Sequence, residues 1–495
     1  MNDETTDERV VVESDDDDLI PYIDQKPALI SRMEIRGLFG RYNYNIQVPK
    51  EARSERLLLF YADNGRGKTT VLRLLWHLLS PAENRSHRTN ISKIVFKSVL
   101  TRLSDGAEIF LSRPAPTDGP YTLRLSRGGQ VVSESEWPDP GSTDRFEGWD
   151  LETMREQMVN WPDEMQREAT AYLLRNAYVG YLKELQARPY FLADDRNIYS
   201  DELDPTLRSK RLYARDLHAR DYAAMAMLEG RQSTGSPEST QGLVAQELEY
   251  SMGRANEMLR QMTVGANATG SASANSVYLD VLRRLGGSTV KREENRAETL
   301  SALRKQIKAL GRRSRAFEAL GLVPSFGSND FVEALTVVAD DRVSIAEDVL
   351  DPFVASLSAR LDALQDAQSL IHTFLDQTNG FLVDKELTFS PGRGLRIKLK
   401  PGPMMLGTSQ LSSGERQVVL LLCNALLGRR GTRLFLIDEP ELSLNAKWQR
   451  KIVPALLACT SGTSVQFLIA THSLELLSNY RSNVVTLTEI DVESQ

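Results

Sequence analysis

The sequence predicts an α/β fold whose two parts are separated along the chain by a large, mostly helical insertion. Buried strands that lead into amphipathic helices occur near the N-terminus, at 56–81, and again from 386 almost to the last residue. Between them, residues 200–385 are mostly polar and follow a helical period. We therefore expect one α/β head, with an antiparallel β-layer at its N-terminal side, that carries a helical insertion.

The N-terminal part reads as a β-layer followed by a strand, a Gly-rich turn and a helix. Residues 30–48 alternate and contain β-branched and aromatic side chains, which predicts two short strands. Over 56–81 an apolar run leads into glycines and then into an amphipathic helix that Pro81 ends. Further predicted elements are strands at 96–101, 107–113 and 121–133, a turn at 128–129, helices over 149–188 and a buried strand at 189–195.

The insertion is predicted to be helical, with two low-complexity stretches at 231–242 and 265–276 that are flexible by composition. Apolar residues recur at helical spacing over 343–378 and form one face. The face is too short for a long coiled-coil arm, so packing on a neighbouring helix is the simpler interpretation. The residues of this face are Leu350, Phe353, Val354, Leu357, Leu361, Leu364, Ile371 and Leu375.

These changes in character divide the chain into four segments. We expect residues 1–18 to form a disordered acidic tail and residues 19–199 to form the N-terminal part of the head. Residues 200–385 are expected to form the helical insertion, and residues 386–495 the C-terminal part of the head.

Composition favours a soluble, cytoplasmic protein. The 495 residues are 41% hydrophobic and 26% charged, and no apolar run is long enough for a membrane helix. The N-terminus is acidic and lacks an apolar core, so it does not resemble a secretory signal. Cys423 and Cys459 are too few for a disulfide framework. The net charge of −7 does not indicate nucleic-acid binding by the whole chain, although a local basic patch could still bind it.

A phosphate-binding loop is predicted between the first buried strand and its helix. The pattern G-x-x-x-x-G-K-[ST] is matched with Ala62 in place of the first glycine. Gly65 and Gly67 let backbone N–H groups form an anion nest at a helix N-terminus, a context that a chance Gly-rich turn would not need. Lys68 would reach the β- and γ-phosphates, and Thr69 would bind Mg²⁺. The other residues of the predicted loop are Asn64, Arg66 and Thr70.

Two carboxylates follow a second buried strand. The apolar residues 434–437 precede Asp438 and Glu439. Ligands of α/β sheets bind at the carboxyl ends of strands. Asp438 would hold Mg²⁺, directly or through water, and Glu439 would orient and deprotonate an attacking water. The alternative is an acidic turn after a strand, which the phosphate-binding loop upstream disfavours.

An apolar helix is preceded by a third motif, LSSGERQ, at 411–417. Ser412 and Gly414 at a helix start could bind a phosphate. If the motif stood alone, an N-cap with a capping-box glutamate would be the better interpretation. His472 follows another buried strand, which would deliver it beside the two carboxylates. The remaining histidines, interpreted as structural, are His77, His87, His218 and His372.

In their chain order these motifs resemble those of ABC-type ATPases. LSSGERQ resembles the signature motif, DEPELSLN at 438–445 resembles Walker B with its D-loop, and THS at 471–473 resembles the switch-histidine loop. Within that class the chain is similar to the SMC/RecF/OLD-like ATPases. RGLFGRYNYNIQV, NGRGKTTVLRLLWHLLSP and DEPELSLNAKWQ are typical of stand-alone ATPases of bacterial phage-defence systems such as Septu, retron-associated and PARIS ATPases. The resemblance covers 30–195 and 386–485.

The resemblance implies a fold, ligands and an assembly. The fold would be an ABC-ATPase head with a RecA-like lobe, and the ligands would be ATP and Mg²⁺. Two heads would dimerise by enclosing two nucleotides, with the signature motif of one copy on the γ-phosphate held by the other. The signature residues in that role are Ser412, Ser413, Gly414 and Glu415. The implied catalytic residues are Lys68, Glu439 and His472.

The chain departs from the family pattern at several positions. Ala62 replaces a glycine, and Asn445 stands where many relatives have histidine in the D-loop. No clear Q-loop is present, although residues 194–196 (Asp194, Asp195 and Arg196) occupy a position where one could lie. Phe39 and Tyr42 are candidates for stacking on adenine, with core packing as the alternative role.

The resemblance implies an ATPase subunit that senses or regulates in an anti-phage defence complex. An effector, a nuclease or toxin, would act in trans, because no nuclease domain fits after His472 and no zinc or HNH-type cluster is evident. The alternatives are a RecF-like DNA repair ATPase and an ATP-bound scaffold with little turnover; a transporter ATPase is disfavoured. Basic residues over 291–315 could bind nucleic acid or an acidic partner, or could be a solvated helix face. They are Lys291, Arg292, Arg296, Arg304, Lys305, Lys308, Arg312, Arg313 and Arg315.

Overall fold

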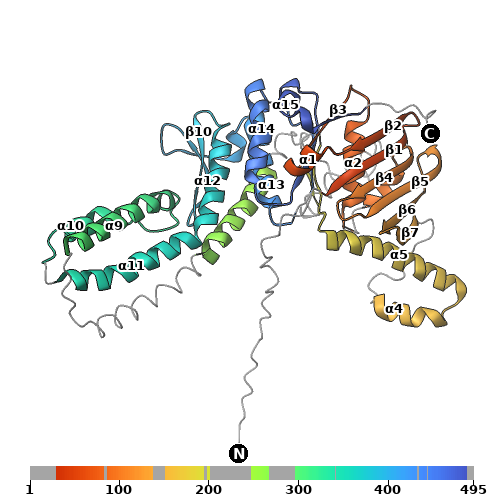
Figure 1. The fold of residues 1–495 in the computed structure, drawn as a ribbon. Coiled ribbons are helices and arrows are strands. Elements are labelled where there is room, and N and C mark those ends of the chain that lie inside the picture. Colours follow the sequence, from red (N-terminus) through yellow and green to blue (C-terminus); the bar gives the residue numbers. More distant parts are fainter. Residues whose placement is uncertain are drawn as a thin grey trace, which may run out of the picture.

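The computed structural model shows a central α/β head, an antiparallel sheet on one side of it and a helical arm that points away on the other (Figure 1). The described residues are 29–82, 86–137, 151–193, 198–200, 247–266, 296–339, 342–431, 434–442 and 444–487. Several expectations lie outside them. These concern the tail at 1–18, the stretch 231–242, most of 265–276, and Asp194, Asp195, Arg196, His218, Lys291 and Arg292.

A six-stranded sheet forms the centre of the head, in the order β15-β3-β14-β13-β8-β9. All neighbouring strands are parallel except β8 and β9. Because β3 lies between two strands from the C-terminal part, both parts of the sequence build one sheet, as the sequence predicted. The strands are β3 (Leu57–Tyr61), β8 (Tyr190–Leu192), β9 (Ile198–Ser200), β13 (Leu434–Asp438), β14 (Gln466–Ala470) and β15 (Val484–Thr486).

Both faces of this sheet are buried, which explains why its strands are apolar without alternation. Successive side chains of a strand point to opposite faces. Leu57 and Leu59 pack into one apolar core, and Leu58 and Phe60 pack into another. Helices α12, α13 and α14 contribute to the first core, and α2, α3 and α5 contribute to the second. Their bounds are α2 (Lys68–Leu79), α3 (His87–Ser92), α5 (Asp163–Leu185), α12 (Gln365–Asn379), α13 (Ser413–Gly428) and α14 (Ala446–Cys459).

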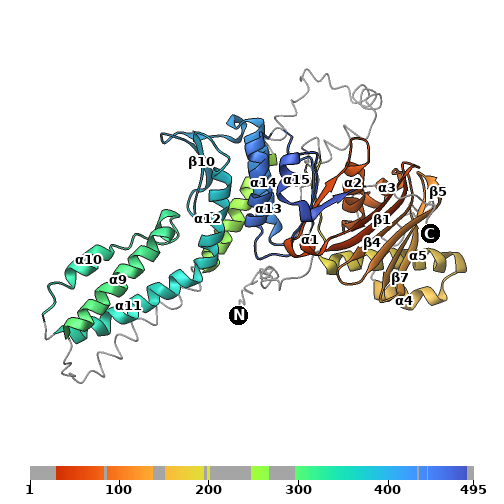
Figure 2. The ribbon, with the colours of Figure 1, turned by 45° about the horizontal axis from the view of Figure 1, so that its top comes forward.

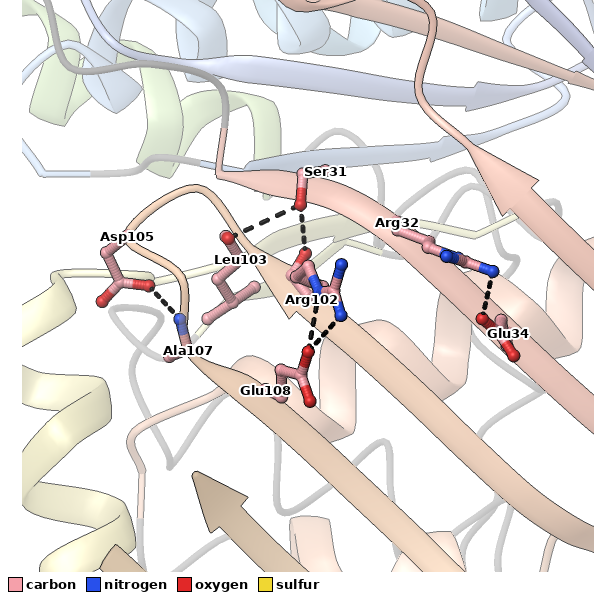
Figure 3. Close-up of polar contacts among 8 residues, drawn as sticks. All are labelled: Ser31, Arg32, Glu34, Arg102, Leu103, Asp105, Ala107 and Glu108. Atoms are coloured by element: carbon pink, nitrogen blue, oxygen red, sulfur yellow. Dashed lines mark hydrogen bonds and ion pairs between the residues drawn. The ribbon is translucent and has the colours of Figure 1, made fainter. Parts of the chain in front are cut away.

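The predicted N-terminal β-layer is a second, antiparallel sheet in the order β2-β1-β4-β5-β6-β7. Ser31 Oγ donates to Arg102 O at 3.0 Å, and Arg102 Nε donates to Glu108 Oε1 at 2.7 Å, which joins β1 to the β4–β5 hairpin (Figure 3). The side chain of Gln466 bonds both the N–H and the C=O of Ile30, so the layer is fixed to β14. The strands are β1 (Ile30–Leu38), β2 (Tyr42–Gln47), β4 (Phe96–Leu103), β5 (Glu108–Thr117), β6 (Tyr121–Arg127) and β7 (Gln130–Trp137).

The arm is built on a pair of long helices, α9 and α11, that run side by side (Figures 1 and 2). This confirms packing on a neighbouring helix, but the prediction of one helix over 343–378 is wrong. The helix breaks at Leu364, because Leu350 packs within the arm whereas Ile371 packs into the core of the head. One straight helix cannot follow both surfaces. The arm helices are α9 (Arg296–Ala319), α10 (Ser328–Ala334) and α11 (Val343–Ala363).

The regular strand–helix alternation expected from residue 386 begins only at α13. A three-stranded antiparallel sheet, β10-β11-β12, precedes it. Gly394, with φ +72°, closes the first hairpin. Asn379, the last residue of α12, accepts from Leu387 N at 2.7 Å and donates to Leu387 O at 3.0 Å, which fixes the arm side to β10. The strands are β10 (Lys385–Ser390), β11 (Gly394–Leu399) and β12 (Met405–Leu406).

Shorter elements complete the described chain. None of the helices that the structure describes is long and apolar enough to cross a membrane. Residues 247–266 are helical and pack into the first core. The remaining helices are α1 (Lys50–Glu55), α4 (Leu151–Gln157) and α15 (Leu474–Asn479), with 3-10 turns at Met158–Asn160, Thr408–Gln410 and Arg481–Asn483.

Candidate nucleotide-binding site

The Gly-rich loop after β3 has the backbone conformation that an anion nest needs. Gly65 and Gly67 have φ values of +78° and +83°, in the left-handed region that favours glycine. A Cβ on Gly67 would lie 2.9 Å from both Leu38 Cδ2 and Phe39 Cε2, so glycine is required there for space as well. Asn64, Gly65, Arg66 and Gly67 precede α2, and Lys68, Thr69 and Thr70 form its first turn. Unpaired N–H groups at this helix start can bind phosphate.

Lys68 is buried among the groups predicted to be catalytic. Its Nζ donates to Ala62 O at 2.9 Å and also contacts His472 Nε2. The same imidazole nitrogen lies 3.2 Å from Glu439 Oε1. Burial lowers the pKa of Lys68, and the carboxylates of Glu439 and Asp438 oppose that shift. The structure therefore brings together one cation, two carboxylates and a histidine from three separate loops.

The two carboxylates lie at the carboxyl edge of the parallel sheet. Asp438 is the last residue of β13 and is buried. Glu439 leaves the strand with φ +49°, a conformation that costs a non-glycine residue on the order of 1 kcal/mol or more. Its N–H donates to Ala470 O at 2.8 Å, at the end of the adjacent β14. The chain accepts this local strain at the residue that is predicted to act on water.

The residues present fit a magnesium ion bound together with a nucleotide. Thr69 lies in the first turn of α2, which packs against β13, and Asp438 ends that strand. A hydroxyl and a carboxylate are hard oxygen ligands of the kind Mg²⁺ takes, with phosphate and water completing the shell. Across the described ranges, no group of three or more His, Cys, Asp or Glu could hold a metal without such help.

Glu441 is a site residue that the sequence analysis did not identify. Its Oε1 accepts hydrogen bonds from Thr471 Oγ1 at 2.6 Å, from His472 N at 2.8 Å and from Ser473 N at 3.0 Å. It therefore joins the turn after β13 to the loop after β14. The only signal in the sequence was a further acidic residue two positions after Glu439.

Ser412 and Glu415 of the signature motif bond each other and Lys385, whereas Gln417, at the end of the motif, donates from Nε2 to Pro440 O at 3.5 Å, in the turn after β13. Ser412 Oγ accepts from Glu415 N at 3.3 Å and Glu415 Oε2 accepts from Ser412 N at 2.8 Å, which is the capping box of the alternative interpretation. Lys385 Nζ donates to both oxygens of Glu415, at 2.8 and 3.0 Å. Burial tends to raise the pKa of Glu415, but the hydrogen bonds from Lys385 and Ser412 hold it below its usual value. Ser412 and Ser413 are exposed and Gly414 is buried.

An aromatic cluster lies beside the phosphate-binding loop. The guanidinium of Arg66 lies 5.2 Å from the centre of the Tyr42 ring, and Tyr44 OH donates to Arg66 O at 2.7 Å. Phe39 meets Tyr42 edge-on at 6.5 Å. Phe39 is 47% exposed, so core packing does not account for it. The cluster leaves an aromatic face available next to the loop.

Asn445, His77 and His87 have structural roles. Asn445, at the D-loop position that departs from the family, caps α14 by accepting from Trp448 N at 3.0 Å. His77 and His87 are buried, with their Nδ1 atoms 3.0 Å apart, in agreement with the structural interpretation. His372 lies exposed on α12.

The basic residues of α9 fall on two different faces. Arg304 donates to Leu335 O at 2.8 Å and Arg313 donates to Asp362 Oδ1 at 2.5 Å, so these two stabilise the arm and do not belong to a free basic surface. Four others are exposed at i, i+3, i+7 and i+10, and therefore share one face of the helix. We call this face the α9 stripe; it consists of Lys305, Lys308, Arg312 and Arg315.

A protein family and several known proteins match parts of the chain. Residues 408–478 match the family described as "AAA domain, putative AbiEii toxin, Type IV TA system". The chain is 25% identical over 154 residues to the "Retron Ec83 probable ATPase" of Escherichia coli, covering 25% of this chain and 28% of that protein. It is 36% identical over 104 residues to "Lipoprotein-releasing system ATP-binding protein LolD 1" of Rhodospirillum rubrum, covering 21% and 41%. The chain thus spans less than half the length of these relatives.

Two solved SMC head domains also match. One is the head with an extended coiled coil, bound to the C-terminal domain of ScpA, from Pyrococcus furiosus, with a TM-score of 0.35, 13% identity and 93% of each chain covered. The other is the head with a coiled coil and joint from Pyrococcus yayanosii, with a TM-score of 0.32, 13% identity, and 94% of this chain and 96% of that chain covered. At such low TM-scores we base no inference on these two structures.

Proposed function

Because the chain is a P-loop protein of the ABC ATPase type that resembles a retron-associated ATPase, we propose that it binds ATP with Mg²⁺ and hydrolyses it. One observation carries this proposal. Lys68 and His472 are 404 positions apart in sequence, yet their side chains touch, and His472 also lies 3.2 Å from Glu439. The groups proposed to bind phosphate, to activate water and to act as the switch therefore lie next to one another.

Each group has a defined task in this proposal. The N–H groups of the loop and Lys68 bind the β- and γ-phosphates. Thr69 and Asp438 would hold Mg²⁺, which supplies positive charge to the phosphates when it is bound. Glu439 orients and deprotonates the attacking water. His472 Nε2 can accept from Lys68 or, as an N–H, donate to Glu439, and the same N–H could donate to a γ-phosphate.

We propose that a second copy of the chain completes each site. Glu415 and Lys385 fix the signature loop, whose Ser412 and Ser413 hydroxyls are exposed. In the described part of the chain, the hydrogen bonds of Ser412 and Glu415 go to each other and to Lys385, and none reaches the phosphate-binding loop. Hydroxyls and the N–H of Gly414 at a helix start are suited to a γ-phosphate held by a partner head.

In the cell, we propose a cytoplasmic sensor or regulator subunit of an anti-phage defence complex that controls a nuclease or toxin in trans. The retron-associated relative and the toxin-family match support this role. Residues 19–199 and 386–495 would be the head, and 200–385 the part that meets partners. The exposed α9 stripe also favours a second candidate, a RecF-like DNA repair ATPase, because exposed cations on one helix face suit phosphates. ATP turnover that DNA stimulates would favour repair, and co-purification with a toxic partner would favour defence.

The central test uses two variants of the head. Lys68→Ala should abolish binding of a fluorescent ATP analogue, since it removes the buried cation of the loop. Glu439→Gln should keep that binding and lose about 10²–10⁴-fold in phosphate release, since the amide keeps the shape but is no base. Equal affinity of Lys68→Ala and wild-type protein would place the nucleotide elsewhere. Near-normal turnover by Glu439→Gln would assign the base to another group.

A further inference from the structure

One carboxylate oxygen holds three consecutive residues of the switch-histidine loop. Glu441 Oε1 accepts from Thr471 Oγ1, His472 N and Ser473 N, all at 2.6–3.0 Å. Thr471 is fully buried and Ser473 nearly so. Thr471 Oγ1 in turn accepts from Ser473 N at 2.9 Å. The backbone of this loop is therefore fixed by the carboxylate of Glu441, which lies in the turn after the neighbouring strand β13.

The other oxygen of Glu441 supports this role. Oε2 is buried, and among the described groups it has no hydrogen-bond partner. The hydrogen bonds of the side chain are thus all directed at the loop. A carboxylate buried in this way is tolerated because charge-assisted hydrogen bonds offset part of its desolvation.

Glu441 and Glu439 belong to the same tight turn. Leu442 N donates to Glu439 O at 3.1 Å, and Glu439 N donates to Ala470 O at 2.8 Å, directly before the switch loop. Because Glu439 and Glu441 lie in the same hydrogen-bonded turn, the hydrogen bonds of Glu441 also set where the imidazole of His472 lies relative to Glu439. The resulting separation between His472 Nε2 and Glu439 Oε1 is 3.2 Å.

We propose that Glu441 is a positioning residue that keeps His472 against Glu439 and Lys68 for ATP hydrolysis. This inference rests on the proposed function. Without Glu441, Thr471 Oγ1 and His472 N lose their acceptor, and Ser473 N keeps only Thr471 Oγ1, so the loop is free to shift. A displacement of about 1 Å at a reacting group can cost on the order of 10²-fold in rate. Glu441 makes no hydrogen bond to the phosphate-binding loop among the described contacts, and its charge acts on Lys68 less than the charges of Glu439 and Asp438 do, so nucleotide affinity should change far less than kcat.

The test compares Glu441→Ala and Glu441→Gln with wild-type protein. Glu441→Ala should lower kcat about 10²-fold, with less than about a threefold change in the affinity for a fluorescent ATP analogue. Glu441→Gln keeps an oxygen acceptor and should recover part of kcat. The ring resonance of His472, assigned with His472→Gln, should shift in Glu441→Ala and return toward its wild-type position in Glu441→Gln. The matched control is Glu475→Gln, because Glu475 lies just after the loop and its side chain pairs only with the exposed Arg450 in the described contacts. In this variant, kcat and the His472 resonance should stay as in wild type.

The readouts separate the two proposals. If wild-type protein binds ATP without hydrolysing it, the proposed activity fails, and the His472 resonance still decides the positioning role. An unmoved His472 resonance in Glu441→Ala would overturn the inference. If Glu441→Ala does not fold, Glu441→Gln decides: a variant with reduced kcat and a shifted His472 resonance supports positioning, and one that matches wild type in both overturns it.

Discussion

The ion pair between Lys385 and Glu415 connects the arm side of the molecule to the signature loop, and Lys385→Met should break it. The two side chains are only 19% and 7% exposed, and methionine keeps most of the apolar stem. Removing one partner of a buried pair costs about 3–5 kcal/mol because the other charge stays buried. Glu415 keeps its hydrogen bond from Ser412 N at 2.8 Å, so we expect the lower end, about 3 kcal/mol.

The loss of stability in Lys385→Met should depend on pH, and the pKa of Glu415 sets the direction of this dependence. The pKa of Glu415 in the folded protein lies below its usual value of 4.5. The pair therefore contributes stability that is fully present above the unfolded pKa and is lost as pH falls through the folded pKa. In Lys385→Met, burial without the lysine should raise the pKa of Glu415, so protonation relieves the buried charge. The difference in the free energy of unfolding between wild type and Lys385→Met should be largest near neutral pH and should decrease in acid.

Thermal unfolding at two pH values measures this effect. At about pH 7 a loss of about 3 kcal/mol corresponds to a fall in Tm on the order of 3 °C for a chain of this length, and at about pH 4 the fall should be smaller. Lys400→Met is the matched control, because Lys400 lies 3.3 Å from Glu386 on the same small sheet but is 52% exposed. Such a surface pair contributes about 0–1 kcal/mol. Equal falls in Tm for Lys385→Met and Lys400→Met would refute the reasoning. So would a Tm difference between wild type and Lys385→Met that does not decrease in acid.

Two further predictions address the assembly and the arm. Ser412→Arg should bind ATP but not hydrolyse it. Mixing this variant with Lys68→Ala protein should restore partial phosphate release, because each mixed dimer rebuilds one composite site. No recovery at any mixing ratio would argue against a site shared between copies. Replacing all four residues of the α9 stripe by glutamate should leave basal ATPase and Tm unchanged but abolish capture of nucleic acid in a pull-down. Wild-type capture through phosphates should weaken steeply with salt, and capture of an acidic protein should weaken less steeply. By contrast, Arg313→Glu should destabilise the arm, since the new carboxylate would face Asp362. If the variant of the α9 stripe captures nucleic acid normally, the stripe is a solvated helix face.

Motifs that depend on local sequence could be predicted, and so could their place in the fold. Gly65 and Gly67 must follow a buried strand and begin a helix, and the structure places them there. Asp438 and His472 follow runs of apolar residues that have no place except a central parallel sheet. The apolar composition of β3 and β14 indicates strands of a sheet that is covered on both faces, but it does not specify that these two strands pair.

Features that depend on contacts between distant segments could not be predicted. Glu441 reads as one more acidic residue after Pro440, and its role appears only when Thr471 and Ser473 lie against it. Lys385 has no motif at all, since its partner Glu415 lies 30 positions away. The break at Leu364 has no proline or glycine to signal it, because competition between two packing surfaces causes it.

The position of β3 in the central sheet has a consequence for the order in which the molecule can form during synthesis. Its neighbours on both sides, β14 and β15, leave the ribosome more than 400 residues after it, and contacts such as Ile30 with Gln466 join residues 436 positions apart. At roughly 5–20 residues per second, the apolar β3 waits about 20–90 s for these partners. The arm and the antiparallel sheet can fold during that interval, but the nucleotide site cannot. The protein should therefore acquire the ability to bind ATP only after its arm has been made, and its half-finished head is a candidate substrate for chaperones.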